Sequence, residues 1–309
     1  MDFFLTELVN GLTLGSVYAL LALGYSMVYG ILKLLNFAHG DVYMIGAFIG
    51  YGVESALGGP LSLSVPLVPL LALMFLAAML GAGLLGVAIE RFAYRRLRNA
   101  PRIAPLITAL GVSFFLESAA LLLFGANYRS MDFFEVSKGV LLFHGLQLTS
   151  GVRVAWAQLI VIVGALLLMA ALTLLVSRTQ VGKAMRATSF DREAAAMMGI
   201  DIDRVIVFTF FVGSALAGAA GVMVGLVFQQ VWPYMGFTAG LKAFTAAVVG
   251  GIGNIPGAML GGITIGLAEA FSTGYLSSTF QDAIVFCILI AVMIARPSGL
   301  LGRAAVQKV

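Results

Sequence analysis

The sequence predicts an all-α fold, a polytopic membrane helix bundle made by a single domain over residues 1–309. Hydrophobic residues make up 61% of the chain and charged residues only 10%, whereas soluble domains carry about 25% charged residues. The mean hydropathy is +1.04. Too few polar side chains are available to cover a water-facing surface, and the only cysteine, Cys287, excludes a disulfide within the chain. We therefore expect eight or nine spans, including two broken helices, and a helix outside the membrane.

Eight apolar runs have about the 20-residue length that crosses a bilayer as a helix. They cover residues 3–30, 36–57, 63–89, 103–124, 155–176, 205–229, 257–274 and 280–295. A ninth run, 239–253, is short and rich in glycine, and it fits either a broken crossing or a re-entrant arm. The first run is too long for a signal peptide, and the first seven residues carry acidic rather than basic side chains. We expect it to remain as a membrane helix.

Lysine and arginine are concentrated in three segments, residues 91–102, 178–204 and 296–308. Such segments accumulate on the cytoplasmic side of membrane proteins, so the C-terminus is expected there. The loop over residues 125–154 carries few basic residues and is expected outside, with the N-terminus. Opposite placement of the two termini favours nine crossings, including 239–253. The net charge of +4 reflects this bias and indicates no nucleic-acid partner.

Small residues recur at helical spacing and predict close packing between spans. Gly213, Ala217, Gly221 and Gly225 would form one face of a helix, which allows helix backbones to approach closely. We expect this face to be buried in the bundle.

Polar residues interrupt the helical pattern at two places. Residues 36–41 read Asn-Phe-Ala-His-Gly-Asp, and residues 250–257 read Gly-Gly-Ile-Gly-Asn-Ile-Pro-Gly. Unwound backbone at membrane depth is tolerated where protein or water satisfies it, which makes both breaks candidates for a solute route. The candidate route or gate residues are Asn36, His39, Asp41, Lys242, Asn254 and Pro256.

Alternatives remain open for the ionisable members of this set. His39 and Asp41 fit a proton relay, a solute contact or a satisfied structural pair at the cytoplasmic end of the second span. Lys242 fits either a route residue or a side chain that extends to the outer interface.

The basic segment over about residues 179–204 predicts an ordered cytoplasmic helix. Ser189 or Thr188 can cap a helix whose first turn carries Asp191 and Glu193. Gly199 is a natural C-terminal stop. A role in docking a partner is one interpretation of this helix.

Several kinds of chemistry lack their sequence signals. The chain contains no G-x-x-x-x-G-K-[ST] motif for ATP phosphates. His39 and His144 are its only histidines, and no Cys/His set has metal-ligand spacing. We expect no cofactor, no metal and no enzymatic activity, and any ATP hydrolysis would belong to another chain.

Three stretches resemble the permease subunits of bacterial branched-chain amino acid ABC importers. They are residues 10–48, residues 246–258, and Glu193-Ala194-Ala195 followed by Gly199, which is similar to the EAA signature of ABC permeases. Residues 246–258 are similar to a signature shared across the branched-chain amino acid and ribose-type permease group. The Ile-Leu-Pro tail of that signature is absent. The chain looks like the shorter, H-type member of a two-permease pair.

The resemblance implies a multi-pass inner-membrane protein that imports leucine, isoleucine and valine. It implies a second, M-type permease, two cytoplasmic ATPase subunits and a periplasmic solute-binding protein as partners. The coupling residues it implies are Arg186, Ser189, Asp191, Glu193, Ala194, Ala195 and Gly199. Importers of urea or short amides share much of the pattern and remain alternatives. A passive channel and a membrane enzyme using His39 and Asp41 are the alternatives from other classes.

Overall fold

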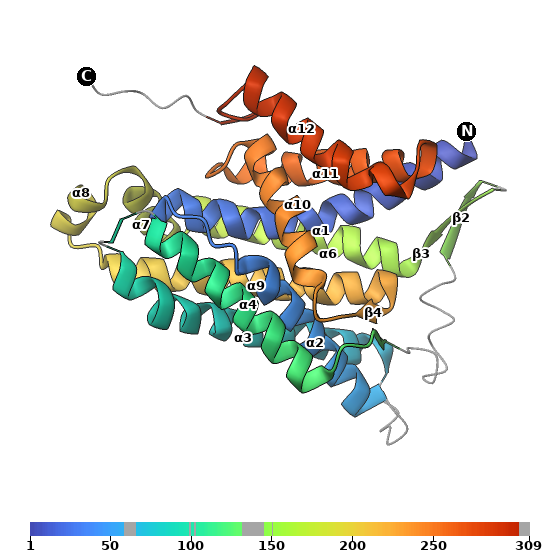
Figure 1. Cartoon of the computed structure of the whole chain (residues 1–309), viewed down its shortest axis with the longest axis horizontal. Helices are drawn as coiled ribbons and strands as arrows, with labels where there is room; N and C mark the ends of the chain where they lie inside the picture. The colour runs from blue at the N-terminus through green and yellow to red at the C-terminus, as the bar shows by residue number, and fades with distance from the viewer. Residues whose placement is uncertain (59–65, 99, 102, 132–144, 150, 303–309) are drawn as a thin grey trace.

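A computed structural model describes residues 1–58, 66–98, 100–101, 103–131, 145–149 and 151–302. Long helices lie side by side along the longest axis of the molecule (Figure 1), which confirms the predicted all-α bundle. Seven helical segments among the described residues are long and apolar enough to span a membrane. They are α1 (Asp2–Leu32), α3 (Leu67–Ile89, continued by short π and 3₁₀ turns to Leu97), α4 (Ile103–Phe124), α6 (Trp156–Arg178), α9 (Ile202–Phe228), α11 (Ile255–Tyr275) and α12 (Gln281–Ala295, preceded by a 3₁₀ turn from Ser278).

Two further helices, α2 (His39–Gly58) and α10 (Met235–Gly250), begin part-way through the bundle. A Cβ added to Gly24 of α1 would lie 2.2 Å from His39 Nε2. Gly24 precedes the end of α1 by eight residues, so α2 starts about 12 Å inside that end. The predicted start of this span at residue 36 was therefore too early, because residues 33–38 form no helix and α2 begins at His39.

The segment before α10 completes a broken crossing. Strand β4 (Gln230–Val231) pairs antiparallel with β1 (Arg129–Ser130), which follows the end of α4. From there the chain turns inward, and α10 starts against α2, where a Cβ on Gly40 would lie 2.3 Å from the Gly236 carbonyl oxygen. The run predicted at 239–253 thus corresponds to α10, Met235–Gly250, which is the helical part of a crossing that begins at β4.

The second predicted break, at residues 250–257, is instead a tight turn between antiparallel helices. Gly251 and Gly253 have φ values of 109° and 88°, which residues with a side chain rarely adopt. Pro256 lies in the first turn of α11, where its missing N–H costs no helical bond. The prediction of a broken helix here was wrong. The two broken crossings are those in which residues 33–38 precede α2 and residues 229–234 precede α10.

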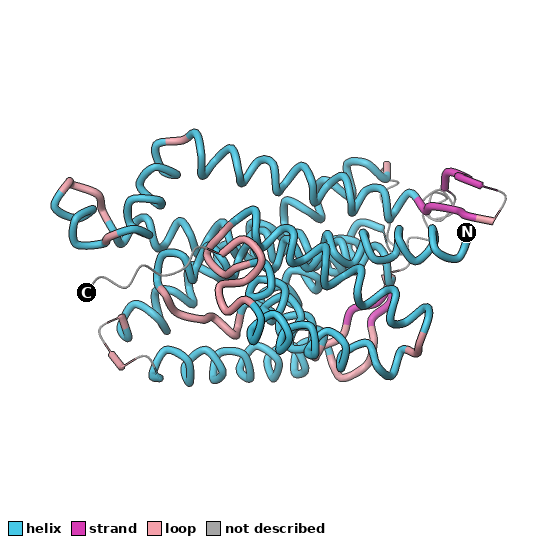
Figure 2. Tube along the Cα trace, turned by 90° about the horizontal axis from the view of Figure 1, so that it is seen from above, coloured by secondary structure: helices cyan, strands magenta, loops and turns pink. Residues whose placement is uncertain are grey.

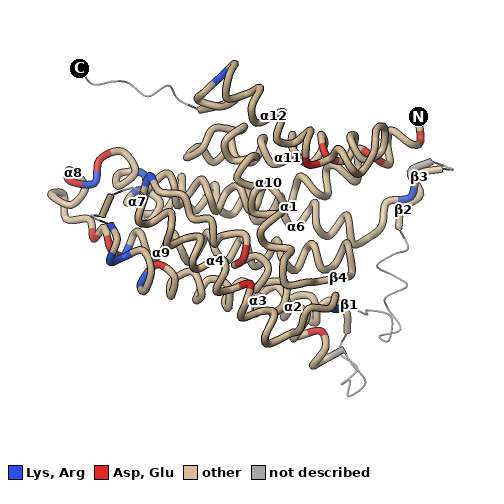
Figure 3. Tube along the Cα trace, in the orientation of Figure 1, with Lys and Arg blue, Asp and Glu red and all other residues tan. Residues whose placement is uncertain are grey.

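Charge distinguishes the two ends of the bundle (Figure 3). Lys and Arg gather beside α7 (Gln180–Phe190), α8 (Arg192–Met197) and the start of α9, which we call the basic end. The opposite end, which we call the N-terminal end, holds the N-terminus and the strands (Figure 2), including the hairpin of β2 (Gly145–Thr149) and β3 (Val152–Ala155). Residues 132–144 of the predicted outer loop, residues 63–65 of the third span and the basic residues beyond 302 lie outside the described residues.

The core forms around α1 and α9. From Gly15 to Met27, every α1 residue is buried, and α1 packs against both α11 and α9. The predicted small-residue face of α9 is buried: a Cβ on Gly221 would lie 2.3 Å from the Tyr43 carbonyl oxygen of α2. Burial of the small-residue face is confirmed.

Candidate functional site

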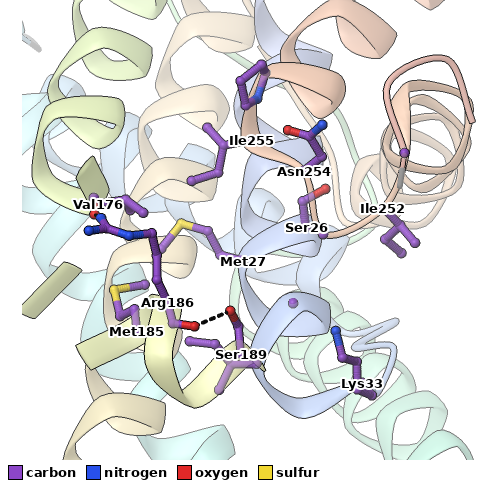
Figure 4. Close-up of a pocket in the computed structure, with 15 residues that line it drawn as sticks. Ser26, Met27, Lys33, Val176, Met185, Arg186, Ser189, Ile252, Asn254 and Ile255 are labelled. Carbon is purple, nitrogen blue, oxygen red and sulfur yellow. Dashed lines mark hydrogen bonds between the residues drawn. The ribbon is translucent and has the colours of Figure 1, made fainter. Parts of the chain in front are cut away.

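A cavity of about 520 Å³ opens at the basic end. Its walls come from the last two turns of α1, from α7 and from the turn between α10 and α11 (Figure 4). Asn254 and Pro256 line it on one side, and Arg186 and Ser189 line it on the other. The cavity therefore brings two predicted gate residues together with two predicted coupling residues.

The residues after α12, 296–302, which we call the C-terminal segment, hold the α10–α11 turn in place. The Leu300 and Leu301 amides donate hydrogen bonds to the Val249 and Gly250 carbonyls, with N–O distances of 2.8 and 3.0 Å. The side-chain amide of Asn254 donates to the Leu301 carbonyl at 2.6 Å. The two amide bonds satisfy carbonyls at the end of α10, which have no partner within the helix. Asn254 is therefore a structural link between the turn and the C-terminal segment.

The predicted coupling segment consists of two helices rather than one. Asp191, with φ −154° and ψ 116°, is extended and separates α7 from α8. Its carboxylate accepts hydrogen bonds from the Glu193 and Ala194 amides, each at 3.0 Å. The predicted cap at Ser189 or Thr188 was wrong, because the Ser189 hydroxyl donates within α7 to the Arg186 carbonyl at 2.8 Å.

The tip formed by α8 is apolar and exposed. Met197 and Met198 are each 83% exposed, and Phe190, just before α8, is 92% exposed. Gly199, with φ 83°, terminates α8 as predicted, and the Ile200 amide closes the helix by donating to the Ala195 carbonyl. Within α8, Ala195 is buried on the inner face, whereas Glu193 and Ala194 are exposed. Exposed apolar side chains outside the spanning helices indicate a surface that another protein covers.

Arg192 connects α8 to the end of α1. Its Nε donates to the Ile31 carbonyl at 3.0 Å, and its Nη2 donates to the same oxygen. The negative end of a helix dipole stabilises such a cation. Burial lowers the pKa of Arg192, and the nearby Arg98 guanidinium lowers this pKa further. Lys33, the next residue after α1, has φ 56° and begins the non-helical segment that leads to α2.

The predicted residues of the 36–41 stretch are buried inside the bundle. The Tyr94 hydroxyl donates to Asn36 Oδ1 at 3.0 Å, and Ser113 donates to Asp41 Oδ2. His39 packs edge-on against Tyr25, with ring centroids 4.8 Å apart. Asn36, His39 and Asp41 are at most 3% exposed, and none of them lines the basic-end cavity. His39 and Asp41 lie in the first turn of α2, and this end of the helix is inside the bundle rather than at the cytoplasmic end of a span.

A second cavity, of about 600 Å³, lies at the N-terminal end. Lys242 lines it and is buried rather than extended to the interface. Its Nζ lies 2.7 Å from a carboxylate oxygen of Glu269 and 2.7 Å from one of Asp282. The Tyr18 hydroxyl donates to the other Glu269 oxygen at 2.9 Å. This network joins α1, α10, α11 and α12.

Sequence reasoning missed Arg192, Tyr18, Asp282 and the C-terminal segment. Only Arg192 carried a local signal, because it is the sole cation within the EAA-like stretch 191–199. Tyr18 and Glu269 are separated by 251 residues, so no spacing pattern could connect them.

Known proteins match the chain over almost its whole length. The family described as the permease component of the branched-chain amino acid transport system matches residues 7–293. The chain is 44% identical over 306 residues to the high-affinity branched-chain amino acid transport permease BraD of Pseudomonas aeruginosa, covering 99% of this chain and 98% of that protein. It is 42% identical over 308 residues to LivH of Escherichia coli K12, with 99% and 98% covered.

Sugar permeases match a smaller part. The ribose import permease RbsC of Haemophilus influenzae is 31% identical over 123 residues, which cover 37% of this chain and 38% of RbsC. A solved inward-facing ABC transporter, described as of metal-chelate type, aligns with a TM-score of 0.50 and 17% identity over 93% of this chain and 85% of that one, and it supports the fold alone. The full-length matches show that this chain belongs to the permease family of branched-chain amino acid transport systems.

Proposed function

We propose that this chain is a membrane-spanning subunit of an ATP-driven ABC importer for leucine, isoleucine and valine, located in the bacterial inner membrane. The observation that carries the proposal is the match to BraD and LivH across 99% of the chain. The alignment with RbsC covers only 37% of the chain, so the sugar permease gives weaker support for a cargo than BraD and LivH do. Urea and short amides remain the competing solutes.

The partners follow from this assignment. A second permease completes the translocation path, two ATPase subunits bind at the cytoplasmic side, and a periplasmic protein delivers the solute. We place the basic end in the cytoplasm because lysine and arginine accumulate there. The N-terminus is then external and the described C-terminal residues are cytoplasmic.

The basic-end cavity supports a specific route for coupling. An ATPase subunit would cover the exposed tip of Phe190, Met197 and Met198. Movement of α8 would pass through Arg192 to the end of α1 and through α7 to the cavity wall. Asn254 and Pro256 on the opposite wall would then form part of the cytoplasmic gate.

The buried 36–41 segment has a different role in this proposal. Asn36, His39 and Asp41 would hold the start of the α2 crossing against its neighbours through Tyr94, Tyr25 and Ser113, and they would meet water only when the gate opens. Ala38 is 0% exposed. A cysteine at this position should therefore react with small water-soluble thiol reagents only in one nucleotide state.

The test is reconstitution of the importer in vesicles with its partners and a panel of labelled solutes. ATP-dependent accumulation of leucine, isoleucine and valine supports the proposal. Accumulation of urea or short amides instead would show that the proposed solute is wrong. Equilibration without ATP would favour a passive channel.

A further inference from the structure

The N-terminal-end cavity has two chemically different walls. Val224, Phe228 and Trp232 line it from the end of α9 and the segment that follows. Lys242, Glu269 and Asp282 line it from α10, α11 and α12. Its volume of about 600 Å³ lies within the roughly 300–1,000 Å³ of small-molecule sites, which combine apolar walls with a few placed polar groups.

The charged wall is not electrically balanced. Lys242 is its only cation among the described lining residues, whereas Glu7, Glu269 and Asp282 are carboxylates. A lysine ammonium has three donors, and the described ion pairs direct two of them to Glu269 and Asp282. The cavity can therefore take in one added carboxylate at Lys242 and one added cation beside the acids.

The two carboxylates bound to Lys242 differ in how tightly they are held. The Glu269 side chain is 8% exposed and also accepts the Tyr18 hydrogen bond. The Asp282 side chain is 53% exposed, so water can replace its contact with Lys242 at small cost. The Lys242–Asp282 pair can open while the Lys242–Glu269 pair stays in place.

We propose that this cavity is a weak site for the zwitterionic amino acid, which inserts between Lys242 and Asp282. The solute carboxylate binds Lys242 Nζ, the solute ammonium binds Asp282, and the branched side chain packs against the α9 wall. The inference rests on the proposed function and adds to it a place where the membrane subunit itself contacts the solute. Opening an ion pair offsets part of the binding energy, so the affinity is low and release is fast.

The experiment measures protection of an introduced cysteine in the assembled importer without its solute-binding protein. Cys287 is the only cysteine of this chain, so a Cys287→Ala background removes its native thiol. Thr238 is exposed and lines the cavity, and Thr238→Cys reports on occupancy through its rate of reaction with a water-soluble maleimide. Ser177→Cys, exposed at the other end, is the matched control.

Millimolar leucine should slow labelling of Thr238→Cys and leave Ser177→Cys unchanged. 4-Methylpentanoate lacks the ammonium and isoamylamine lacks the carboxylate, so each should protect less than leucine. Equal protection by all three would overturn the zwitterion site, because only apolar contact would then matter. Absence of protection by leucine would overturn it as well.

An Asp282→Asn variant isolates the ammonium contact, because it leaves the Lys242–Glu269 pair intact. Leucine protection should require about tenfold more leucine, a factor that corresponds to roughly 1.4 kcal/mol. Protection by 4-methylpentanoate should not weaken, because Lys242 is then more available. Asp2→Asn, at the same end but outside the cavity lining, is the charge-matched control, and equal weakening in both variants would contradict the site.

Transport in the same preparation separates this inference from the proposed function. If the importer with its binding protein accumulates leucine but leucine never protects Thr238→Cys, the inference fails and the proposed function stands. If it accumulates another class of solute and not leucine, both fail.

Discussion

Replacing Asp191 by alanine removes the side chain that begins α8. Asp191 accepts hydrogen bonds from two amides of the first turn, each at 3.0 Å, and loss of such a cap costs about 0.5–2 kcal/mol. α8 has only six residues, too few for a helix to be stable by propagation alone. A loss of about 1 kcal/mol lowers the ratio of folded to frayed α8 about fivefold.

We expect solute-stimulated ATP hydrolysis and transport to fall together by up to about fivefold in Asp191→Ala, while the permease pair still assembles. Asp191→Ser should retain much of the activity, because serine also caps helices. The assay compares ATP hydrolysis and uptake in the same vesicles.

Asp201→Ala is a matched control for this prediction. Asp201 caps α9 through the Arg204 amide at 3.1 Å, but α9 has 27 residues and is packed in the bundle. Loss of the Asp201 cap should therefore reduce transport and stimulated ATP hydrolysis much less than loss of the Asp191 cap. Equal losses of transport and stimulated ATP hydrolysis in Asp191→Ala and Asp201→Ala, or full coupling in Asp191→Ala, would refute the proposal that the ATPase subunit binds at α8.

Three further changes test other parts of the structure. Glu193→Arg places a cation at the positive end of α8 and should reduce transport and stimulated ATP hydrolysis without disrupting assembly; normal coupling would argue against docking through α8. Gly24→Ala places a Cβ 2.2 Å from His39 Nε2 and should lower the melting temperature of the purified complex, since overpacking costs about 1–3 kcal/mol. Gly52→Ala should leave the melting temperature unchanged, because its added Cβ would have no neighbouring atom within 4 Å. Ile255 lines the basic-end cavity, so a cysteine in Ile255→Cys should react with water-soluble thiol reagents at a rate that depends on bound nucleotide. Absence of reaction in every nucleotide state would show that the α10–α11 turn is not part of the gate.

The spans were predictable because each depends on local composition. α4 spans Ile103–Phe124, as the apolar run indicated, and α6 begins and ends within two residues of its predicted bounds. Lipid requires about 20 apolar residues wherever a helix crosses, so this signal needs no knowledge of neighbours. Termination of α8 at Gly199 was likewise readable from one residue.

The starting depth of α2 and α10 was not predictable, because distant residues determine it. Gly40 lies against Gly236 and Gly240, so the two broken crossings meet where neither has a side chain. Residues 250–257 look like a break in the sequence, yet the residues around Leu301, some 50 positions later, stabilise them as a turn. Local patterns indicate where backbone leaves the helix but not which segment satisfies it.

The candidate site was only partly readable for the same reason. Lys242 was identified as an ionisable residue in a late span, but its burial depends on Glu269 and Asp282 in two other helices. Asp191 was recognised as favourable in a first helical turn, whereas it is the cap, because the chain becomes extended there and separates α7 from α8.

Uptake by the reconstituted importer tests the central claim most directly. The measurement follows labelled leucine, urea and a short amide in vesicles that contain this chain, its permease and ATPase partners and the solute-binding protein. We predict ATP-dependent accumulation of leucine, with competition by isoleucine and valine and none by urea or the amide. ATP-dependent accumulation of urea or the amide without leucine would contradict the assignment of this chain as a branched-chain amino acid permease.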